Sequence, residues 1–308
     1  MVSIHLLGKF AVTVADHVIS GLEASKAQEI FAYLLVHRQR PHTREVLIDQ
    51  LWTDYTKDQA QKGLRQALWQ LQSALGAPSS GLAETLLLVD TVWVQLNPAG
   101  VFWLDVAELE ASYDKVQGTP GHALTAEDAQ RLTATVQLYR GDLLEGCYHD
   151  WCLAERERLQ QMHLALLDKL MDYDESQGNY ETALAYGERI LRYDRAREQT
   201  HRKLMQLHCL AGDRTGALRQ YEACVAALAT ELTVKPAKRT EALYQAIKAD
   251  RLTEQPLPTV VPPLPATAPP SLPALLTHLQ QIYVALADLQ NNVANDIELI
   301  EQLLHTSQ

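Results

Sequence analysis

The chain lacks several features that would place it in a common class. Its 308 residues contain four cysteines and no apolar run that approaches the ~18 residues of a membrane span. The start, MVSIHLLGKF, lacks the charged region and apolar core of a signal peptide. Four cysteines are too few for a disulfide scaffold in a chain of this size, so they indicate free thiols in a reducing cytoplasm. We therefore expect a cytoplasmic protein with no membrane segment.

Signatures of catalysis and cofactor binding are also missing. The sequence has no GxGxxG, GxSxG or HExxH motif, and Gly8-Lys9 lacks the preceding glycine of a phosphate-binding loop. Cys147, His149 and Cys152 are zinc-ligand types, but structural zinc needs four ligands and no fourth is evident nearby. Buried thiols at the start of a long helix explain this segment more simply. The expectation is a protein that is not an enzyme and holds no cofactor or metal.

Positive charge is in deficit, although nucleic-acid binders usually carry a basic surface. The formal net charge is −11, with 8 basic and 9 acidic residues in 1–100, 19 and 24 in 101–252, and 0 and 5 in 253–308. The first hundred residues are thus the least acidic part, but they are not positive.

Residues 1–100 combine short strands with three helices and a hairpin. Strands are expected at 3–7, 9–14 and 17–20, and the hairpin at 86–89 and 92–96. Ser25 and Thr43 can cap two helices, and a third helix follows over Lys57–Leu75. A third helix before a β-ribbon is the arrangement of a winged helix-turn-helix, which places that helix in the major groove of DNA.

The third helix separates an apolar stripe from a polar face. The stripe repeats at helical spacing and consists of Leu64, Ala67, Leu68, Leu71 and Leu75. The opposite face and its neighbours supply side chains that can reach phosphates or base edges. We expect double-stranded DNA to be contacted by Lys57, Lys62, Arg65, Gln66, Trp69, Gln70 and Ser73, with Arg44 of the second helix and Thr91 of the hairpin turn. Trp69 has a second interpretation, as part of a protein interface.

Residues 101–252 are expected to be helical and partly repeated. Helices are predicted over 105–117, 126–140, 150–176, 180–194, 197–211, 214–230 and 238–250. GNYETAL from Gly178 and GDRTGAL from Gly212 lie 34 residues apart, which is the period of tetratricopeptide (TPR) repeats. Such repeats stack into a curved surface that binds proteins or peptides. An ordinary helical bundle is the alternative.

The last part of the chain predicts a linker and a coiled coil. Eight prolines lie in 253–273, so 253–270 is expected to be an extended linker. Residues 271–308 show a heptad pattern formed by Leu272, Leu275, Leu279, Ile282, Leu286, Leu289, Val293, Ile300 and Leu303, broken at Asp296. A single tethered helix cannot bury this stripe alone. We therefore expect it to assemble homo-oligomers.

Taken together, these segments resemble a known family of regulators. The motifs are LRQAL…ALG from Leu64, VWVQLNP from Val92, LDVAELE from Leu104, YRGDLLEG from Tyr139 and AERERL from Ala154. Their order is similar to that of the SARP class of bacterial transcriptional activators, in which an OmpR/PhoB-type winged helix precedes a bacterial transcriptional activator domain. The resemblance covers about residues 2 to 252. It implies DNA binding by the winged helix, and self-association or RNA-polymerase contact by the helical domain.

One departure from that family concerns the second half of the third helix. Relatives typically place basic residues there, whereas this chain has Gln70, Gln72 and Ser73. Glutamine can read adenine edges, but it provides none of the attraction that comes from counterion release. A protein-binding scaffold that has lost DNA binding is therefore the rival interpretation.

The sequence thus predicts a mainly α protein with a small α+β winged helix-turn-helix domain. Its expected parts are the winged helix at 1–100, the TPR-like activator domain at 101–252, the proline-rich linker at 253–270 and the coiled-coil helix at 271–308. The expected partners are double-stranded DNA, RNA polymerase or another protein, and further copies of the chain.

Overall fold

Two small sheets and three helices form the first part of the chain. The computed structural model describes residues 2–15, 17–22, 25–75 and 86–251. In the four-stranded sheet, of order β3-β2-β1-β7, β1 (Val2–His5) is antiparallel to β2 (Ala11–Val14) and parallel to β7 (Phe102–Leu104). Strand β3 (His17–Val18) borders β2. The second sheet has the order β4-β6-β5, with β4 at His42–Thr43, β5 at Leu87–Val89 and β6 at Trp93–Leu96.

Two of the three helices begin directly after the predicted capping residues. In α1 (Lys26–Val36) the Ser25 side chain accepts a hydrogen bond from the Gln28 N–H, and in α2 (Arg44–Leu51) Thr43 accepts from the Val46 N–H. Helix α3 spans Lys57–Leu75 and buries the predicted leucine and alanine stripe together with Ala60. The order of sheet, three helices and hairpin is that of a winged helix.

A glycine determines how closely α3 approaches the end of α2. A Cβ atom at Gly63 would lie 2.7 Å from Nε1 of the Trp52 side chain, which follows α2 and is 5% exposed. A larger residue at this position would force the two helices apart. Gly63 therefore helps to set the angle at which the outward face of α3 is presented.

Two strands were not expected from the sequence. Strand β4 is two residues long and pairs with β6, and β7 is three residues long and pairs with β1. Both form through pairing with strands about 50 or 100 positions away, and short segments carry little local signal of such pairing. Strand β7 also lies beyond residue 100, so the sheet of the winged helix includes residues from the region expected to be helical.

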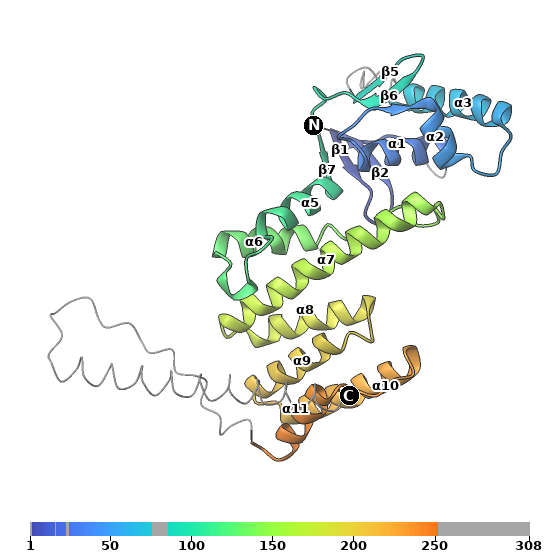
Figure 1. Cartoon of the computed structure of the whole chain (residues 1–308). Coiled ribbons are helices and arrows are strands. Elements are labelled where there is room, and N and C mark those ends of the chain that lie inside the picture. Colours follow the sequence, from blue (N-terminus) through green and yellow to red (C-terminus); the bar gives the residue numbers. More distant parts are fainter. Residues whose placement is uncertain (1, 16, 23–24, 76–85, 252–308) are drawn as a thin grey trace, which may run out of the picture. The chain divides into compact units, whose positions relative to one another are not determined.

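Helices fill the described chain beyond β7. They are α5 (Asp105–Val116), a short 3₁₀ helix (Gly121–Ala123), α6 (Ala126–Val136), α7 (Asp150–Ser176), α8 (Tyr180–Tyr193), α9 (Glu198–Leu210), α10 (Arg214–Glu231) and α11 (Lys238–Lys248). Helices α7, α8, α9 and α10 pack in succession, each against the next (Figure 1). The expected boundaries are confirmed to within a few residues, except that α6 ends at Val136 and not at 140.

The 34-residue repeat is visible in the backbone of two turns. Gly178 and Gly212 both have positive φ angles, +76° and +78°. The N–H of Asn179 donates to the carbonyl of residue 174 at 2.8 Å, and the N–H of Asp213 donates to residue 208 at 2.7 Å. Helices α7 and α9 therefore end in the same left-handed turn, which a glycine adopts at little cost.

The winged helix and the helical region share one core. Buried apolar side chains form one cluster that runs from Val2 in β1 to Leu207 in α9, and residues Met1–Tyr244 form one compact unit. Asp105, at the start of α5, is fully buried, and its carboxylate accepts hydrogen bonds from the N–H groups of Leu6, Leu7 and Val106 at 2.8–3.0 Å. Burial raises the pKa of Asp105, while these hydrogen bonds lower it.

Side-chain contacts extend this junction along α1. Glu110 of α5 accepts from Arg38, just beyond α1, and from Arg158 of α7, each at 2.6 Å. The Trp151 ring of α7 packs edge-on against the Tyr33 ring of α1, with centroids 5.1 Å apart. The winged helix is thus attached to the helical region by a shared sheet, ion pairs and aromatic packing.

No helix in the described ranges is long and apolar enough to span a bilayer. The predicted linker at 253–270 and the coiled coil at 271–308 lie outside the described residues.

Candidate nucleic-acid interface

The outward face of α3 is open to solvent along its length. Lys62, Arg65, Gln66 and Ser73 are exposed, and the Trp69 side chain at the centre of this face is 67% exposed. Their spacing places these five side chains on one side of the helix, opposite the buried leucines. Lys57 is exposed at the first residue of α3, and Gln70 is half-buried at the flank of the face.

The cations of this face differ from a group of paired cations in the helical region. Within the described residues, Lys57, Lys62 and Arg65 form no ion pair with a carboxylate. By contrast, several cations of the helical region are paired: Lys115, Arg131, Arg156, Arg158, Arg197, Arg202 and Lys203. The three cations of α3 can therefore bind an external anion without first breaking such a pair.

Arg44 connects the start of α2 to the hairpin turn. Its Nε and Nη2 atoms donate to the carbonyl oxygen of Asp90 at 3.0 and 2.8 Å, and its backbone N–H donates to the carbonyl of Val92 at 3.0 Å. The Asp90 carboxylate accepts from the N–H groups of Val92 and Trp93, both at 2.6 Å, and these hydrogen bonds lower the pKa of Asp90. Arg44 thus fixes the position of the wing tip relative to α2 and α3.

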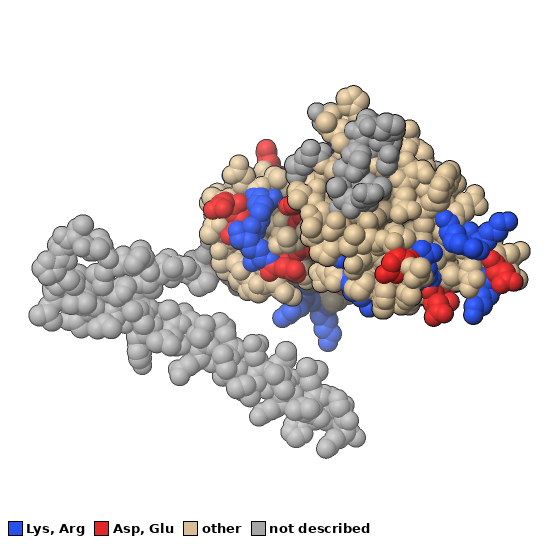
Figure 2. Space-filling view, turned by 90° about the horizontal axis from the view of Figure 1, so that it is seen from above, with Lys and Arg blue, Asp and Glu red and all other residues tan. Residues whose placement is uncertain are grey.

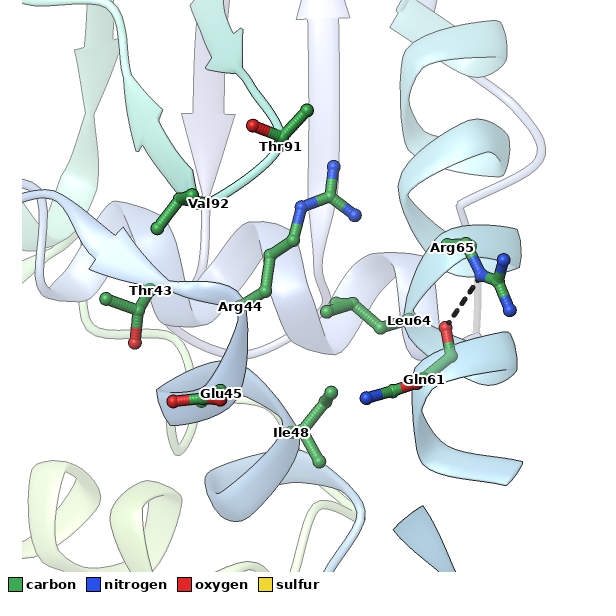
Figure 3. A pocket seen from close by; sticks show the side chains of 9 residues that line it. All are labelled: Thr43, Arg44, Glu45, Ile48, Gln61, Leu64, Arg65, Thr91 and Val92. Atoms are coloured by element: carbon green, nitrogen blue, oxygen red, sulfur yellow. Dashed lines mark hydrogen bonds between the residues drawn. The ribbon is translucent and has the colours of Figure 1, made fainter. Parts of the chain in front are cut away.

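An open hollow of about 460 Å³ lies between α2, α3 and the wing turn. In Figure 3, Arg44 points toward Thr91, while Arg65 on α3 turns back and donates from Nε to the carbonyl of Gln61 at 3.3 Å. The hollow is lined by Thr43, Arg44, Glu45, Ile48, Gln61, Leu64, Arg65, Thr91 and Val92. It therefore brings two predicted cations and the predicted wing residue to one place.

Beside this hollow, the wing exposes apolar side chains. Leu88, Val92 and Trp93 are 41%, 52% and 44% exposed, so with Trp69 they give the winged helix an apolar as well as a polar surface. The view in Figure 2 shows a surface that is mostly free of charge. Lys and Arg side chains gather with Asp and Glu toward the end at which α3 begins. A second group of Lys, Arg, Asp and Glu lies at the opposite end of the view, and the surface between the two groups carries few charges.

The structure places the predicted residues in two groups. Lys62, Gln66, Trp69 and Ser73 share the outward face of α3, and Arg44, Arg65 and Thr91 meet at the hollow. Lys57 and Gln70 flank these groups. Gln61, Gln72, Val92 and Trp93 were not among the predicted contacts, because their place depends on where the wing lies against α3.

Comparisons with known proteins cover the helical region and the overall fold. The family model named "Bacterial transcriptional activator domain" matches residues 104–248. Among solved structures, "Mycobacterium tuberculosis EmbR in complex with low affinity phosphopeptide" is similar, with a TM-score of 0.62 and 21% sequence identity. The match covers 83% of this chain and 66% of that chain, so this chain spans slightly less than two thirds of its length. A comparison with curated protein sequences found no significant match.

These findings agree with the domain order seen in the structure. At 21% identity the likeness to EmbR concerns the fold, and it extends over both the winged helix and the helical region. The matched family begins at Leu104, the last residue of β7, and ends at the last residue of α11. Residues 104–248 therefore carry a bacterial transcriptional activator domain, and this domain follows a winged helix in the order that the sequence motifs indicated.

Proposed function

We propose that the protein is a cytoplasmic transcription regulator that binds promoter DNA through α3 and the wing. One observation carries the proposal: α3 presents an unobstructed outward face whose three cations form no ion pair with a described carboxylate. An α-helix fits the ~12 Å width of the major groove, so this face can enter it. The protein acts by binding and not by catalysis.

The proposed contacts fall into two kinds. Lys57, Lys62 and Arg65 bind phosphates, while Gln66 and Ser73 lie where base edges are reached. The exposed ring of Trp69 packs on sugars or on thymine methyl groups. Arg44 supports this binding by holding the wing turn through the carbonyl of Asp90. Thr91 at that turn contacts the DNA backbone beside the groove.

The helical region supplies protein contacts in this proposal. Helices α7 to α10 form a repeated stack, and such stacks bind proteins or peptides on one face. RNA polymerase, another protein or a second copy of the chain is the expected partner. The junction through Asp105, Glu110 and Trp151 would transmit a change in this region to the winged helix.

The test is selection of binding sites from a randomised duplex pool at ~50 mM salt. The full chain is compared with Gln66→Glu, which places a carboxylate on the outward face of α3, and with Gln130→Glu, the same change on an exposed position of α6. We expect the wild type and Gln130→Glu to enrich one motif. Gln66→Glu should bind it at least about tenfold more weakly, because like charges repel across an interface. No retention by the wild type, or equal binding by all three, would count against the proposal.

A protein-binding scaffold is the second candidate. The exposed Leu88, Val92 and Trp93 of the wing, together with Trp69, favour it because apolar and aromatic side chains are typical of protein interfaces. In that case Trp69→Ala should abolish binding to a protein partner, and no duplex should be retained at low salt.

A further inference from the structure

The segment from Cys147 to Cys152 joins the turn after α6 to the first turn of α7. Cys147 is half-buried, Cys152 is fully buried, and both are free thiols. No group of three or more His, Cys, Asp or Glu side chains suited to a metal ion occurs in the described ranges. Both residues lie against the Arg156 guanidinium, whose Nη2 atom is 3.2 Å from the Cys147 carbonyl oxygen and 4.0 Å from the Cys152 sulfur, and the interaction between the two thiols is the largest influence on the pKa of each.

The surroundings of Cys147 favour its thiolate. The hydrogen bond from Cys152 is the largest cause that lowers the pKa of Cys147, and the backbone N–H of His149 donates a second one. His149 is the N-cap of α7 and makes no side-chain cap bond, so the sulfur lies at an uncapped helix N-terminus. Burial and the charge of Glu29 oppose this effect at Cys147, while the hydrogen bond with Cys147, burial and the charge of Cys147 raise the pKa of Cys152.

An arginine holds the pair and its turn in place. Nη2 of Arg156 donates to the carbonyl oxygens of Leu143, Leu144 and Cys147 at 2.9–3.2 Å, and lies 4.0 Å from the Cys152 sulfur. The Cys152 thiol also lies 3.7 Å from the carbonyl of Leu143. The turn that carries Cys147 is therefore fixed against the first turns of α7.

The same short segment contacts the winged helix. Nε2 of His149 lies 3.0 Å from Nζ of Lys26 and 3.2 Å from the Glu29 carboxylate, both on α1. Trp151 packs against Tyr33 of the same helix. Both contact residues lie between the two cysteines, so a bond between the thiols would change the geometry of residues that hold α1.

We propose that Cys147 and Cys152 form a reversible disulfide in response to peroxide, and that this bond alters the contacts between α7 and α1. The Cys147 thiolate attacks one oxygen of hydrogen peroxide: an S–O bond forms, the O–O bond breaks, and the leaving hydroxide takes a proton to become water. The Cys152 sulfur then attacks the Cys147 sulfur of the sulfenic acid. An S–S bond forms, the S–O bond breaks, and a second water leaves with the Cys152 proton.

The balance of the reaction is two thiols and one peroxide to one disulfide and two waters. The sulfur pair loses two electrons and the peroxide oxygens gain them. An external dithiol restores both thiols by exchange through a mixed disulfide.

The first experiment treats the full chain with equimolar hydrogen peroxide at pH 7 and follows its intact mass and a peptide map. We expect a loss of about two mass units, mapped to a Cys147–Cys152 link and reversed by dithiothreitol. Iodoacetamide should label Cys147 at least about tenfold faster than Cys209, a half-buried thiol of α9 whose pKa is raised by burial. Absence of the link in the wild type, or equal labelling of Cys147 and Cys209, would overturn the proposal.

Variants separate the two steps. In Cys152→Ser the Cys147 sulfenic acid should persist and react with dimedone, whereas Cys147→Ser should form neither the acid nor the link at this segment. Cys209→Ser is the matched control and should oxidise like the wild type. Circular dichroism of each variant checks that it is folded, and the wild-type mass map does not depend on any variant.

The effect on the junction is measured by hydrogen exchange in α1. Oxidation should change exchange of the Lys26–Val36 amides at least about threefold in the wild type and in Cys209→Ser, but not in Cys147→Ser. A disulfide that leaves α1 unchanged would refute the coupling. The regulatory meaning rests on the proposed DNA binding. If neither the reduced nor the oxidised protein binds the DNA duplex, the proposed DNA binding fails. The mass and hydrogen-exchange results still decide whether the disulfide forms and changes α1.

Discussion

The salt dependence of DNA binding tests quantitatively whether the cations of α3 contact phosphates. The change is the double substitution Lys62→Ala/Arg65→Ala, which removes two exposed side chains from the outward face. Neither forms an ion pair with a described carboxylate, and both lie outside the buried stripe of α3. We therefore expect the variant to fold with unchanged stability, within about 0.5 kcal/mol.

The expected magnitude follows from the number of phosphate contacts. With Lys57, Lys62 and Arg65 each neutralising one phosphate, log K should fall with log salt at a slope of about −2.7 per bound chain. The affinity then falls about 40-fold between 50 and 200 mM salt. The double variant keeps one such contact, so its slope should be about −0.9 and its loss about fourfold over the same range.

Fluorescence anisotropy of a labelled duplex, titrated at four salt concentrations, measures this slope. The matched control is Lys235→Ala/Lys238→Ala, which removes the same charge from exposed positions of the helical region. We expect the control to keep the wild-type slope. Equal slopes for the two double variants would place the phosphate contacts elsewhere, and a flat wild-type slope would mean that the face of α3 does not bind DNA.

Three further predictions concern stability and assembly. His163 is fully buried, and burial lowers its pKa to about 3. Below pH ~6.5 the unfolded chain therefore binds a proton that the folded chain does not, so the free energy of unfolding falls as the pH falls. In urea unfolding, His163→Phe should make the fall between pH 7 and pH 5 smaller by about 2 kcal/mol. A Cβ at Gly187 of α8 would clash with the Leu204 side chain of α9, so Gly187→Leu should cost about 2 kcal/mol by thermal melting, whereas Ala185→Leu at an exposed position should cost less than about 0.5 kcal/mol. Deleting 271–308 should lower the particle mass by light scattering; an unchanged mass would contradict the coiled-coil prediction.

Much of the fold could be predicted because its signals are local. The caps at Ser25 and Thr43, the leucine stripe of α3 and the paired turns at Gly178 and Gly212 each depend on residues within a few positions. Helix formation and left-handed turns are governed by such neighbours, so one sequence is enough to locate them. The exposed face of α3 follows from the same stripe, because the residues opposite a buried side must point outward.

The features that link the two regions required the tertiary structure. Strand β7 pairs with β1 across about 100 residues, and Asp105 is buried because that pairing brings the N–H groups of Leu6 and Leu7 to its carboxylate. Arg44 was predicted to contact DNA, and the structure shows its guanidinium bound to the Asp90 carbonyl of the wing turn. The sequence contains no local pattern for any of these contacts.

By itself, then, the sequence determined where helices begin and end and which sides of them are apolar, since both depend on short-range periodicity. Only the tertiary structure decided how the wing lies against α3, which cations stay unpaired, and how Cys147 and Cys152 come to lie beside α1. The physical reason is that these properties arise from contacts between distant residues, such as Arg44 with Asp90 at a separation of 46 and Lys26 with His149 at a separation of 123. Such contacts form only once the shared core has excluded water and set the distances between elements.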